Sequence, residues 1–363
     1  FAYFLFSGRL RIKLRYLSFF LALSFVGFFA AVFFLPSITP FNASLNAVLS
    51  GYIKLLASFL YFLVGFSIFE KGWSEAIVRS YSIGAFIIGF FGLLVTVSGT
   101  GFLRAQFLYG NFRLRGLMND PNYFSVIQVS ALVFFLRYRG MRSIVRFLVS
   151  LTLIFSIVAS GSKTGLLTLA IYSVFFLFEE AYRTRRKVFL LTVICLAILL
   201  ALLAYAALAD KHLDILDSLS RIIPAFSRVK LLFTDFSSAL VEGGSGRNTA
   251  WYVAASIIQL FPVFGIGFGT YSKVSSTLFG TRVIAHNTFF QIFAEWGIPL
   301  AVCFFVFVMF QIIKASQDKR KNDYVVIVAR DIVIVLLIGS LGISLNNARM
   351  FWFFLGSLAN IDY

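Results

Sequence analysis

Long apolar stretches alternate with short polar connections along most of the chain. The stretches lie at about 16–35, 52–69, 81–98, 122–136, 144–160, 164–178, 188–209, 288–313 and 325–343, with a shorter one at 350–361. Because about 20 apolar residues are needed to cross a bilayer as a helix, the shorter stretches must include flanking residues. The pattern predicts an all-α polytopic membrane protein with about ten or more transmembrane helices. Residues 1–363 show no internal repeat and no Pro- or Ser-rich linker, so we expect one membrane domain.

The chain opens on the apolar segment FAYFLFS and has no initiator methionine. We interpret this segment as the end of a helix whose beginning is missing from the sequence. It does not resemble a signal peptide, because the basic residues follow the apolar segment and do not precede it.

The amino-acid composition is that of a membrane protein, and the net positive charge must be interpreted in this context. Hydrophobic residues make up 60% of the chain, charged residues 13%, and the mean hydropathy is +0.91. A soluble domain is about half apolar and about a quarter charged. The net charge of +17 does not indicate nucleic acid, because the basic residues form short clusters between apolar stretches. We therefore expect the lipid bilayer as a partner and no nucleic acid.

The basic clusters predict the orientation of the chain in the membrane. They lie at 9–15, 137–146, 182–187 and 314–321, on one side if the predicted spans alternate. Lys and Arg concentrate on the cytoplasmic side of membrane proteins, so this side is predicted to be cytoplasmic. The long connection 210–287 then lies on the exterior face, together with the shorter connections 99–121 and 160–163.

The exterior loop 210–287 is predicted to contain amphipathic helices. Apolar residues recur at helical spacing between Leu213 and Ile223, with charged residues on the other face, as in a helix that lies on a membrane surface. NTAWYVAASIIQLF predicts a second helix that Pro262 ends. GIGFGTY then predicts a flexible turn, in which glycine allows the backbone to approach a ligand.

Several basic residues lie on the predicted exterior face, against the usual topology. These residues are Arg104, Arg113, Arg115, Lys163, Arg247 and Arg349. A diphosphate ligand would compensate such cations, because guanidinium and ammonium groups bind phosphate oxygens. The alternative is that they bind phospholipid head groups or single acids such as Asp120. Their position on one face favours the diphosphate.

His286 and Asn287 begin the late stretch 288–313 on the same predicted face. A neutral imidazole can take a proton from a sugar hydroxyl near pH 7, so His286 is a candidate catalyst. A structural hydrogen-bonding role is the alternative. Asn287 and the later Glu295 are candidates for orienting the acceptor.

Other chemistries have weaker support. Cys195 and Cys303 lie inside apolar stretches and match neither a disulfide framework nor a metal site. GIGFGT lacks the context of a dinucleotide site, and SGSKTG lacks the spacing of a phosphate loop. We therefore expect no metal and no cofactor. Acidic residues within the spans are few, Glu295 and Asp331, which argues against a proton-relay transporter.

Four motifs in order resemble the O-antigen ligase and O-antigen polymerase family of bacterial membrane enzymes. They are RLRGLMNDPNYFS (113–125), SGSKTG (160–165), SGRNTAWYVAASIIQLFPVFGIGFGTY (245–271) and HNTFFQIFAEWGIP (286–299). The resemblance extends over roughly 113–300. It implies a GT-C-class glycosyltransferase of the bacterial inner membrane that works at the periplasmic face. Such enzymes take a glycan from undecaprenyl diphosphate, invert the anomeric centre and need no metal.

The resemblance also implies roles for individual residues. Arg113, with Arg115 as an additional cation, and Lys163, where arginine is common in the family, would bind the donor diphosphate. Arg247 corresponds to the family's loop arginine, with a diphosphate-binding and catalytic role. His286 would activate the acceptor hydroxyl.

The last motif bears on the choice between polymerase and ligase. Ligases that transfer O-antigen to lipid A core show His-Asn, nine residues, Gly, two residues, and then Gly, Thr or Tyr. This chain has His286-Asn287, nine residues, Gly297, and then Leu300. We therefore favour a polymerase, whose acceptor glycan is lipid-linked, and keep the ligase as the alternative. A flippase of lipid-linked sugars is the alternative of another class. It predicts charges in several spans and an internal duplication, neither of which is present.

Overall fold

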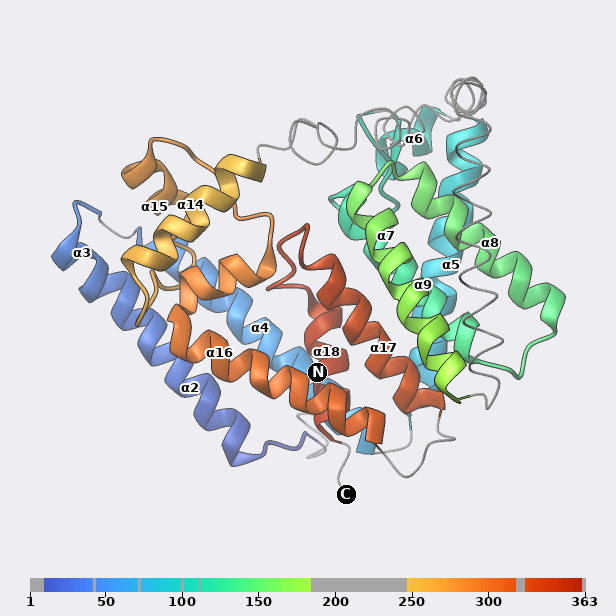
Figure 1. Cartoon of the computed structure of the whole chain (residues 1–363). Helices are drawn as coiled ribbons and strands as arrows, with labels where there is room; N and C mark the ends of the chain where they lie inside the picture. Colours follow the sequence, from blue (N-terminus) through green and yellow to red (C-terminus); the bar gives the residue numbers. More distant parts are fainter. Residues whose placement is uncertain are drawn as a thin grey trace. The chain divides into compact units, whose positions relative to one another are not determined.

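The computed structural model describes residues 10–41, 44–70, 73–98, 101–110, 112–183, 247–317 and 324–360. Regular structure in these residues is almost entirely helical, and the only strands among them form one hairpin of two-residue strands (Figure 1). The predicted helical fold class is thus confirmed for this part of the chain.

Five of the described helical segments are long and apolar enough to cross a membrane. They are Leu14–Ile38, Leu45–Phe69, Ser74–Ser98, Lys163–Tyr182 and Thr288–Gln317. The expected total of about ten spans stays a prediction. The predicted span 188–209 and the first part of the loop, 210–246, lie outside the described residues.

The chain divides into two compact units, which are described separately. Unit 1 consists of Phe1–Ser80 and Gly244–Tyr363, and unit 2 of Tyr81–Gly243. This division does not test whether residues 1–363 form one membrane domain, so that expectation stays a prediction.

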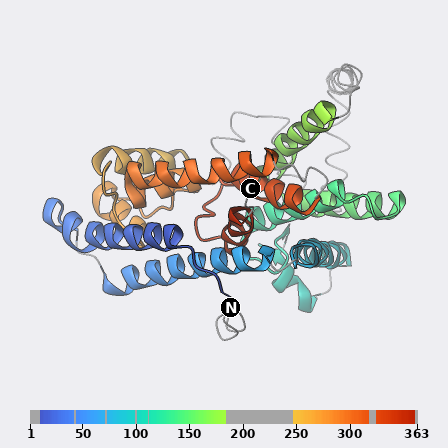
Figure 2. The same cartoon turned by 90° about the horizontal axis from the view of Figure 1, so that it is seen from below.

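The first half of unit 1 is built from two long helical segments. α2 (Leu14–Phe29) continues through the π-helical turn η1 (Ala30–Phe34) into α3 (Leu35–Ile38), and α4 (Leu45–Glu70) follows. α4 packs closely along α18 (Arg349–Ala359), as Figure 2 shows. A Cβ atom at Gly65 would lie 1.9 Å from the carbonyl oxygen of Phe353, so only glycine permits this close approach.

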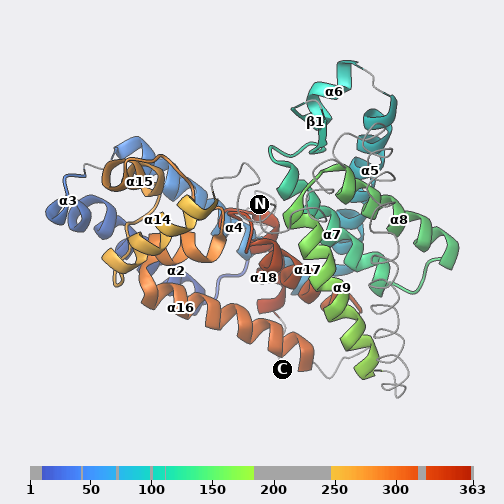
Figure 3. The ribbon, with the colours of Figure 1, turned by 45° about the horizontal axis from the view of Figure 1, so that its top comes forward.

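The second half of unit 1 is organised around a bent helix, α16 (Thr288–Gln317). It bends at Gly297, whose φ of 76° is not helical. Around it lie α14 (Arg247–Leu260), α15 (Tyr271–Phe279) and α17 (Tyr324–Gly339), visible in Figure 3. The predicted helix NTAWYVAASIIQLF is confirmed as α14, which ends just before Pro262.

The loop between α14 and α15 binds the backbone of α16 at its bend. Gly267 N donates a hydrogen bond to Glu295 O at 3.0 Å, and Ile298 N donates to Pro262 O at 2.7 Å. A bend in a membrane helix exposes backbone groups that must find partners elsewhere, and this loop supplies them. Glu295 is therefore held directly against the glycine-rich loop.

The glycines of this loop serve helix packing. A Cβ atom at Gly267 would lie 2.3 Å from Gly27 O, and one at Gly269 would lie 2.1 Å from Ala47 O. Both have left-handed backbone angles, with φ of 73° and 74°. The sequence interpretation, that glycine here allows the approach of a ligand, is replaced by an approach of α2 and α4.

The basic segments of unit 1 gather at one end of its helices. Arg11 N donates to Ser67 Oγ at 3.0 Å, and Tyr16 Oη donates to Ala359 O at 3.3 Å, which joins the start of α2 to the ends of α4 and α18. At the other end, Thr288 N donates to Ser340 O at 2.9 Å, so α16 begins beside the end of α17. The His286 motif is therefore separated along the helices from the basic residues near Arg11.

Unit 2 contains most of α5 (Ser74–Ser98), α6 (Gly101–Phe107), α7 (Pro121–Arg137), α8 (Ser143–Ala159) and α9 (Lys163–Arg183). α7 is buried between α8 and α9. The hairpin of β1 (Leu108–Tyr109) and β2 (Arg113–Leu114) packs at the end where α7 begins. The ion pairs Arg137–Glu179 and Arg139–Glu180 mark the opposite, basic end of the unit.

Candidate functional site

Arg113 lies buried in unit 2 and joins two of the sequence motifs. It is 7% exposed in strand β2. Its Nε donates to the carbonyl oxygen of Ser160 at 2.9 Å, and its Nη2 donates to Asn122 Oδ1 at 3.2 Å. The predicted cation therefore links the motif at 113–125 to the motif at 160–165.

The same cluster contains further polar contacts that fix its geometry. Ser162 Oγ donates to Asn122 Oδ1 at 2.9 Å and accepts a hydrogen bond from Gly165 N at 3.0 Å. Asp120 caps α7, because its Oδ1 accepts hydrogen bonds from the backbone N–H groups of Asn122 and Tyr123. Asp120 thus has a helix-capping role, and the ion-pairing role that the sequence alternative gave it stays a prediction.

Arg115 and Lys163 lie at the same end of unit 2. Arg115 Nη2 donates to Ala105 O at 2.9 Å, and its backbone N–H donates to Phe107 O, so it holds α6 against the hairpin. Lys163 begins α9 directly after Ser162 and is half-buried. Unit 2 therefore brings Arg113, Arg115 and Lys163 to one end of its helices.

Arg247 and His286 both lie at helix starts in unit 1. Arg247 is the first residue of α14, and His286 lies two residues before α16. One turn into each helix, Trp251 and Phe290 pack edge to face, with ring centroids 6.2 Å apart. The two predicted catalytic residues thus lie at neighbouring helix starts.

His286 has an unusual backbone conformation. Its φ is 49°, and it is the only non-glycine residue with positive φ in the described part of the chain. Such conformations cost about 1–3 kcal/mol and cluster at active sites and ligand-binding sites. The structure therefore singles out His286 independently of the sequence pattern.

Asn287 holds His286 in place. Its Oδ1 accepts a hydrogen bond from Phe290 N at 3.1 Å and so caps α16, while its Nδ2 donates to Leu341 O at 3.1 Å. The helix-capping role explains its 7% exposure. The acceptor-orienting role assigned to Asn287 from sequence stays a prediction.

A polar cavity of about 170 Å³ surrounds Glu295 in unit 1. Its polar lining comes from α4, α15, α16 and the connection before α18: Lys54, Ser58, Tyr271, Ser272, Gln291, Glu295, Asn346 and Asn347. Sequence analysis identified only Glu295 among them. The spacing of Gln291 and Glu295, one helical turn apart, is a signal that could have added Gln291.

Burial controls the chemistry of this cavity. Glu295 is 6% exposed, and its Oε1 accepts a hydrogen bond from Gln291 Nε2 at 3.0 Å. Tyr271 is 3% exposed. Its burial, and secondarily the charge of Glu295, raise the pKa of the Tyr271 hydroxyl above its ordinary value. The hydroxyl therefore stays protonated and can donate a hydrogen bond at neutral pH.

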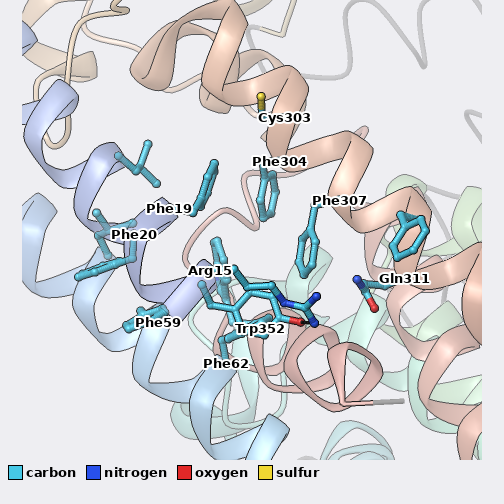
Figure 4. Close-up of a pocket in the computed structure, with 14 residues that line it drawn as sticks. Arg15, Phe19, Phe20, Phe59, Phe62, Cys303, Phe304, Phe307, Gln311 and Trp352 are labelled. Carbon is cyan, nitrogen blue, oxygen red and sulfur yellow. Dashed lines mark hydrogen bonds between the residues drawn. The ribbon is translucent and has the colours of Figure 1, made fainter. Parts of the chain in front are cut away.

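An apolar cavity of about 300 Å³ lies next to the polar one. Aromatic side chains from α2, α4, α16 and α18 line it, among them Phe19, Phe59 and Phe307, and Figure 4 shows Arg15 and Gln311 at one end. Leu55 and Trp352 line both cavities. A polar compartment is thus adjacent to an aromatic one within unit 1.

The predicted site residues fall into two groups. Arg113, Arg115 and Lys163 lie in unit 2, and Arg247, His286, Asn287 and Glu295 lie in unit 1. In the part of the chain that the structure describes, no group of three His, Cys, Asp or Glu side chains could hold a metal ion. The expectation of a reaction without metal or cofactor stays a prediction.

Part of the chain matches a known protein family. Residues 148–305 match the protein-family model described as O-antigen ligase. The matched segment includes three of the four sequence motifs, from SGSKTG to HNTFFQIFAEWGIP. No curated protein matches the chain.

Proposed function

We propose that the chain is a glycosyltransferase of bacterial surface-polysaccharide assembly, and the match of residues 148–305 to the family model described as O-antigen ligase supports this proposal. It moves a glycan from undecaprenyl diphosphate to a sugar hydroxyl. It works as a multi-pass protein of the bacterial inner membrane, at the periplasmic face. The five apolar helices and the family match support this assignment.

The observation that carries the proposal is the backbone of His286. A side chain held in a left-handed conformation beside the start of α14 is suited to a fixed chemical task. His286 accepts the proton of the acceptor hydroxyl as that oxygen attacks the anomeric carbon of the donor. The bond from this carbon to the diphosphate oxygen breaks, the diphosphate leaves with the electron pair, and the anomeric centre is inverted.

The cations act on the leaving group in this proposal. Charge develops on the departing diphosphate, and preorganised cations are most effective where charge develops. Arg113 is held by its contacts with Ser160 and Asn122, so its guanidinium needs little rearrangement. Arg115, Lys163 and Arg247 supply further positive charge.

The aromatic cavity of unit 1 is suited to the hydrocarbon of a lipid-linked substrate. Its lining is almost entirely apolar, and it shares Leu55 and Trp352 with the polar cavity. A polyprenyl chain in the aromatic cavity would leave the sugars that follow its diphosphate near the polar cavity. This continuity is what favours a lipid-linked glycan over a free one.

Leu300 favours a polymerase, because it stands where the lipid A core ligases show Gly, Thr or Tyr. Transfer to lipid A core is the second candidate, and it takes support from the description of the matching family model.

The deciding experiment uses purified protein with lipid-linked repeat units, with and without lipid A core. Glycans are separated by size on a gel. Ladders of increasing length support the polymerase, and transfer only to lipid A core supports the ligase. Movement of the lipid-linked sugar across the bilayer without bond formation would show a flippase and contradict the proposal.

A further inference from the structure

Two buried polar atoms of the cavity around Glu295 have no hydrogen-bond partner. Among the residues that the structure describes, the Tyr271 hydroxyl and Gln291 Oε1 are buried and make no hydrogen bond. Both residues line the cavity, which contains other groups able to bond a ligand. Two independent polar groups are thus left unsatisfied at the same place.

Such groups are costly in the absence of a ligand. A buried polar atom without a partner costs about 1–3 kcal/mol, and most buried polar groups in proteins are satisfied. Tyr271 can donate and accept a hydrogen bond, whereas Gln291 Oε1 and Glu295 accept. The matching ligand therefore presents several hydroxyl groups, which donate to Gln291 and Glu295 and accept from Tyr271.

The size and charge of the cavity narrow the ligand class. Its volume of about 170 Å³ gives room for a compact ligand such as one sugar ring. Lys54 is the only cation among the lining residues. One cation does not balance the charge of a buried diphosphate, so a neutral polyol fits better.

We propose that this cavity is a subsite for one sugar ring of the acceptor glycan, held by Tyr271, Gln291 and Glu295. This assignment rests on the proposed function. It places Glu295, the predicted acceptor-orienting residue, in a binding site that also contains Tyr271, Gln291 and Lys54. Glu295 and Tyr271 determine which sugar is accepted, because their hydrogen bonds depend on the positions of the hydroxyl groups. The proton of the reacting hydroxyl is still taken by His286.

Binding is tested directly, because Trp296 and Trp352 line the cavity and report on it by fluorescence. The full chain in detergent is titrated with methyl glycosides of hexoses, N-acetylhexosamines, 6-deoxyhexoses and uronic acids. We expect a saturable change in tryptophan fluorescence for one of these classes. The affinity should fall about two- to ten-fold in Tyr271→Phe and about ten- to a hundred-fold in Glu295→Gln.

Matched controls separate the subsite from general effects of substitution. Tyr252→Phe and Glu75→Gln change an exposed tyrosine and an exposed glutamate, and should leave the titration unchanged. Tyr271→Phe removes a hydroxyl without a partner, so the unliganded variant should unfold at the same temperature as the wild type or a higher one. A structural role for the hydroxyl would instead lower the unfolding temperature.

The outcomes for the subsite and for the proposed function are distinguishable. If no glycoside changes the fluorescence of the wild type, or if Tyr271→Phe and Glu295→Gln bind as the wild type does, the subsite is refuted. The glycan-assembly assay can still succeed in that case. If glycosides bind and the two variants weaken binding, the subsite stands even when no glycan is assembled.

Discussion

The polar groups around Arg113 in unit 2 and those around Glu295 in unit 1 differ in whether they have hydrogen-bond partners within the protein. In unit 2, Arg113 and Ser162 both donate to Asn122, and Asp120 caps α7, so the geometry of the cluster is fixed by contacts within the protein. In unit 1, Tyr271 and Gln291 line a cavity, and the Tyr271 hydroxyl and Gln291 Oε1 make no hydrogen bond within the described residues.

This difference indicates two ways of building a binding surface. A cluster that is tied internally holds a cation in a fixed position, which suits electrostatic stabilisation of a leaving group. A cavity with unsatisfied groups is suited to recognition of a ligand that completes its hydrogen bonds. The variants below test whether the two groups differ in function as they do in contacts.

The largest effect is expected for His286→Ala. Loss of a general base typically lowers the rate about a hundred- to ten-thousand-fold. Turnover of lipid-linked donor by the purified variant should fall accordingly, while donor binding stays intact. His286→Gln should be no better, because an amide cannot accept the proton. Near-normal glycan assembly by His286→Gln would reduce the residue to an orienting role, with the cations of unit 2 carrying the catalysis.

The bend of α16 should be indispensable for the unit 1 cavity. At Gly297→Ala, the new Cβ would lie 2.1 Å from Val263 O and the residue would keep a φ of 76°. Overpacking and the left-handed backbone together should cost about 2–5 kcal/mol of unfolding free energy. Gly280→Ala is the matched control. Gly280 also has positive φ, 66°, but a Cβ there meets no atom within 4 Å, so denaturation should show a loss of only about 1–2 kcal/mol.

Arg113 and Arg247 should separate binding from folding. In both alanine variants the affinity for a lipid-linked donor should fall about ten- to a hundred-fold, because a charge-assisted contact contributes about 1.5–3 kcal/mol. Arg113→Ala should also lower the unfolding temperature, since it removes the bonds to Ser160 and Asn122.

Thermal denaturation and donor titration on the same preparations measure both effects. Arg79→Ala, an exposed arginine on α5, is the control and should change neither quantity. Arg247→Lys keeps the charge and loses the planar fork, so it reports whether the diphosphate contact is bidentate. If a stable Arg247→Ala variant bound the donor with unchanged affinity, the proposed contact of Arg247 with the diphosphate would be contradicted.

Sequence predicted the helices of this chain well. Each predicted apolar stretch in the described residues coincides with a helix, because about 20 apolar residues in a row leave a membrane segment few other structures. The start of α4 was missed: it begins at Leu45, where the stretch was expected from residue 52. Polar residues in its first turns, such as Asn46, interrupt the apolar pattern without interrupting the helix.

The site was predicted only in part, for a different physical reason. Arg113, Lys163, Arg247 and His286 could be proposed from sequence because each lies within a motif of contiguous residues, and their roles stay predictions. The cavity around Glu295 was not found, because its lining is assembled from distant segments such as Lys54 and Tyr271. Its position depends on the bend at Gly297 and on backbone hydrogen bonds between α16 and the glycine-rich loop. Neither feature can be predicted from a short stretch of sequence.

The smallest effect is expected for the stability of two variants at His286. Their comparison tests the backbone conformation separately from the imidazole side chain. His286→Gly and His286→Ala both remove the imidazole, so both should be inactive. Alanine keeps the cost of a φ of 49°, whereas glycine adopts it without strain. Glycine avoids a backbone strain of about 1–2 kcal/mol that alanine keeps. Its greater freedom in the unfolded chain costs about 0.4–1 kcal/mol, so the unfolding free energy of His286→Gly should exceed that of His286→Ala by about 0.5–1 kcal/mol. His286→Gly should therefore unfold at a slightly higher denaturant concentration than His286→Ala. Equal midpoints would show that the conformation at residue 286 stores no strain, and the backbone argument for a catalytic His286 would then be lost.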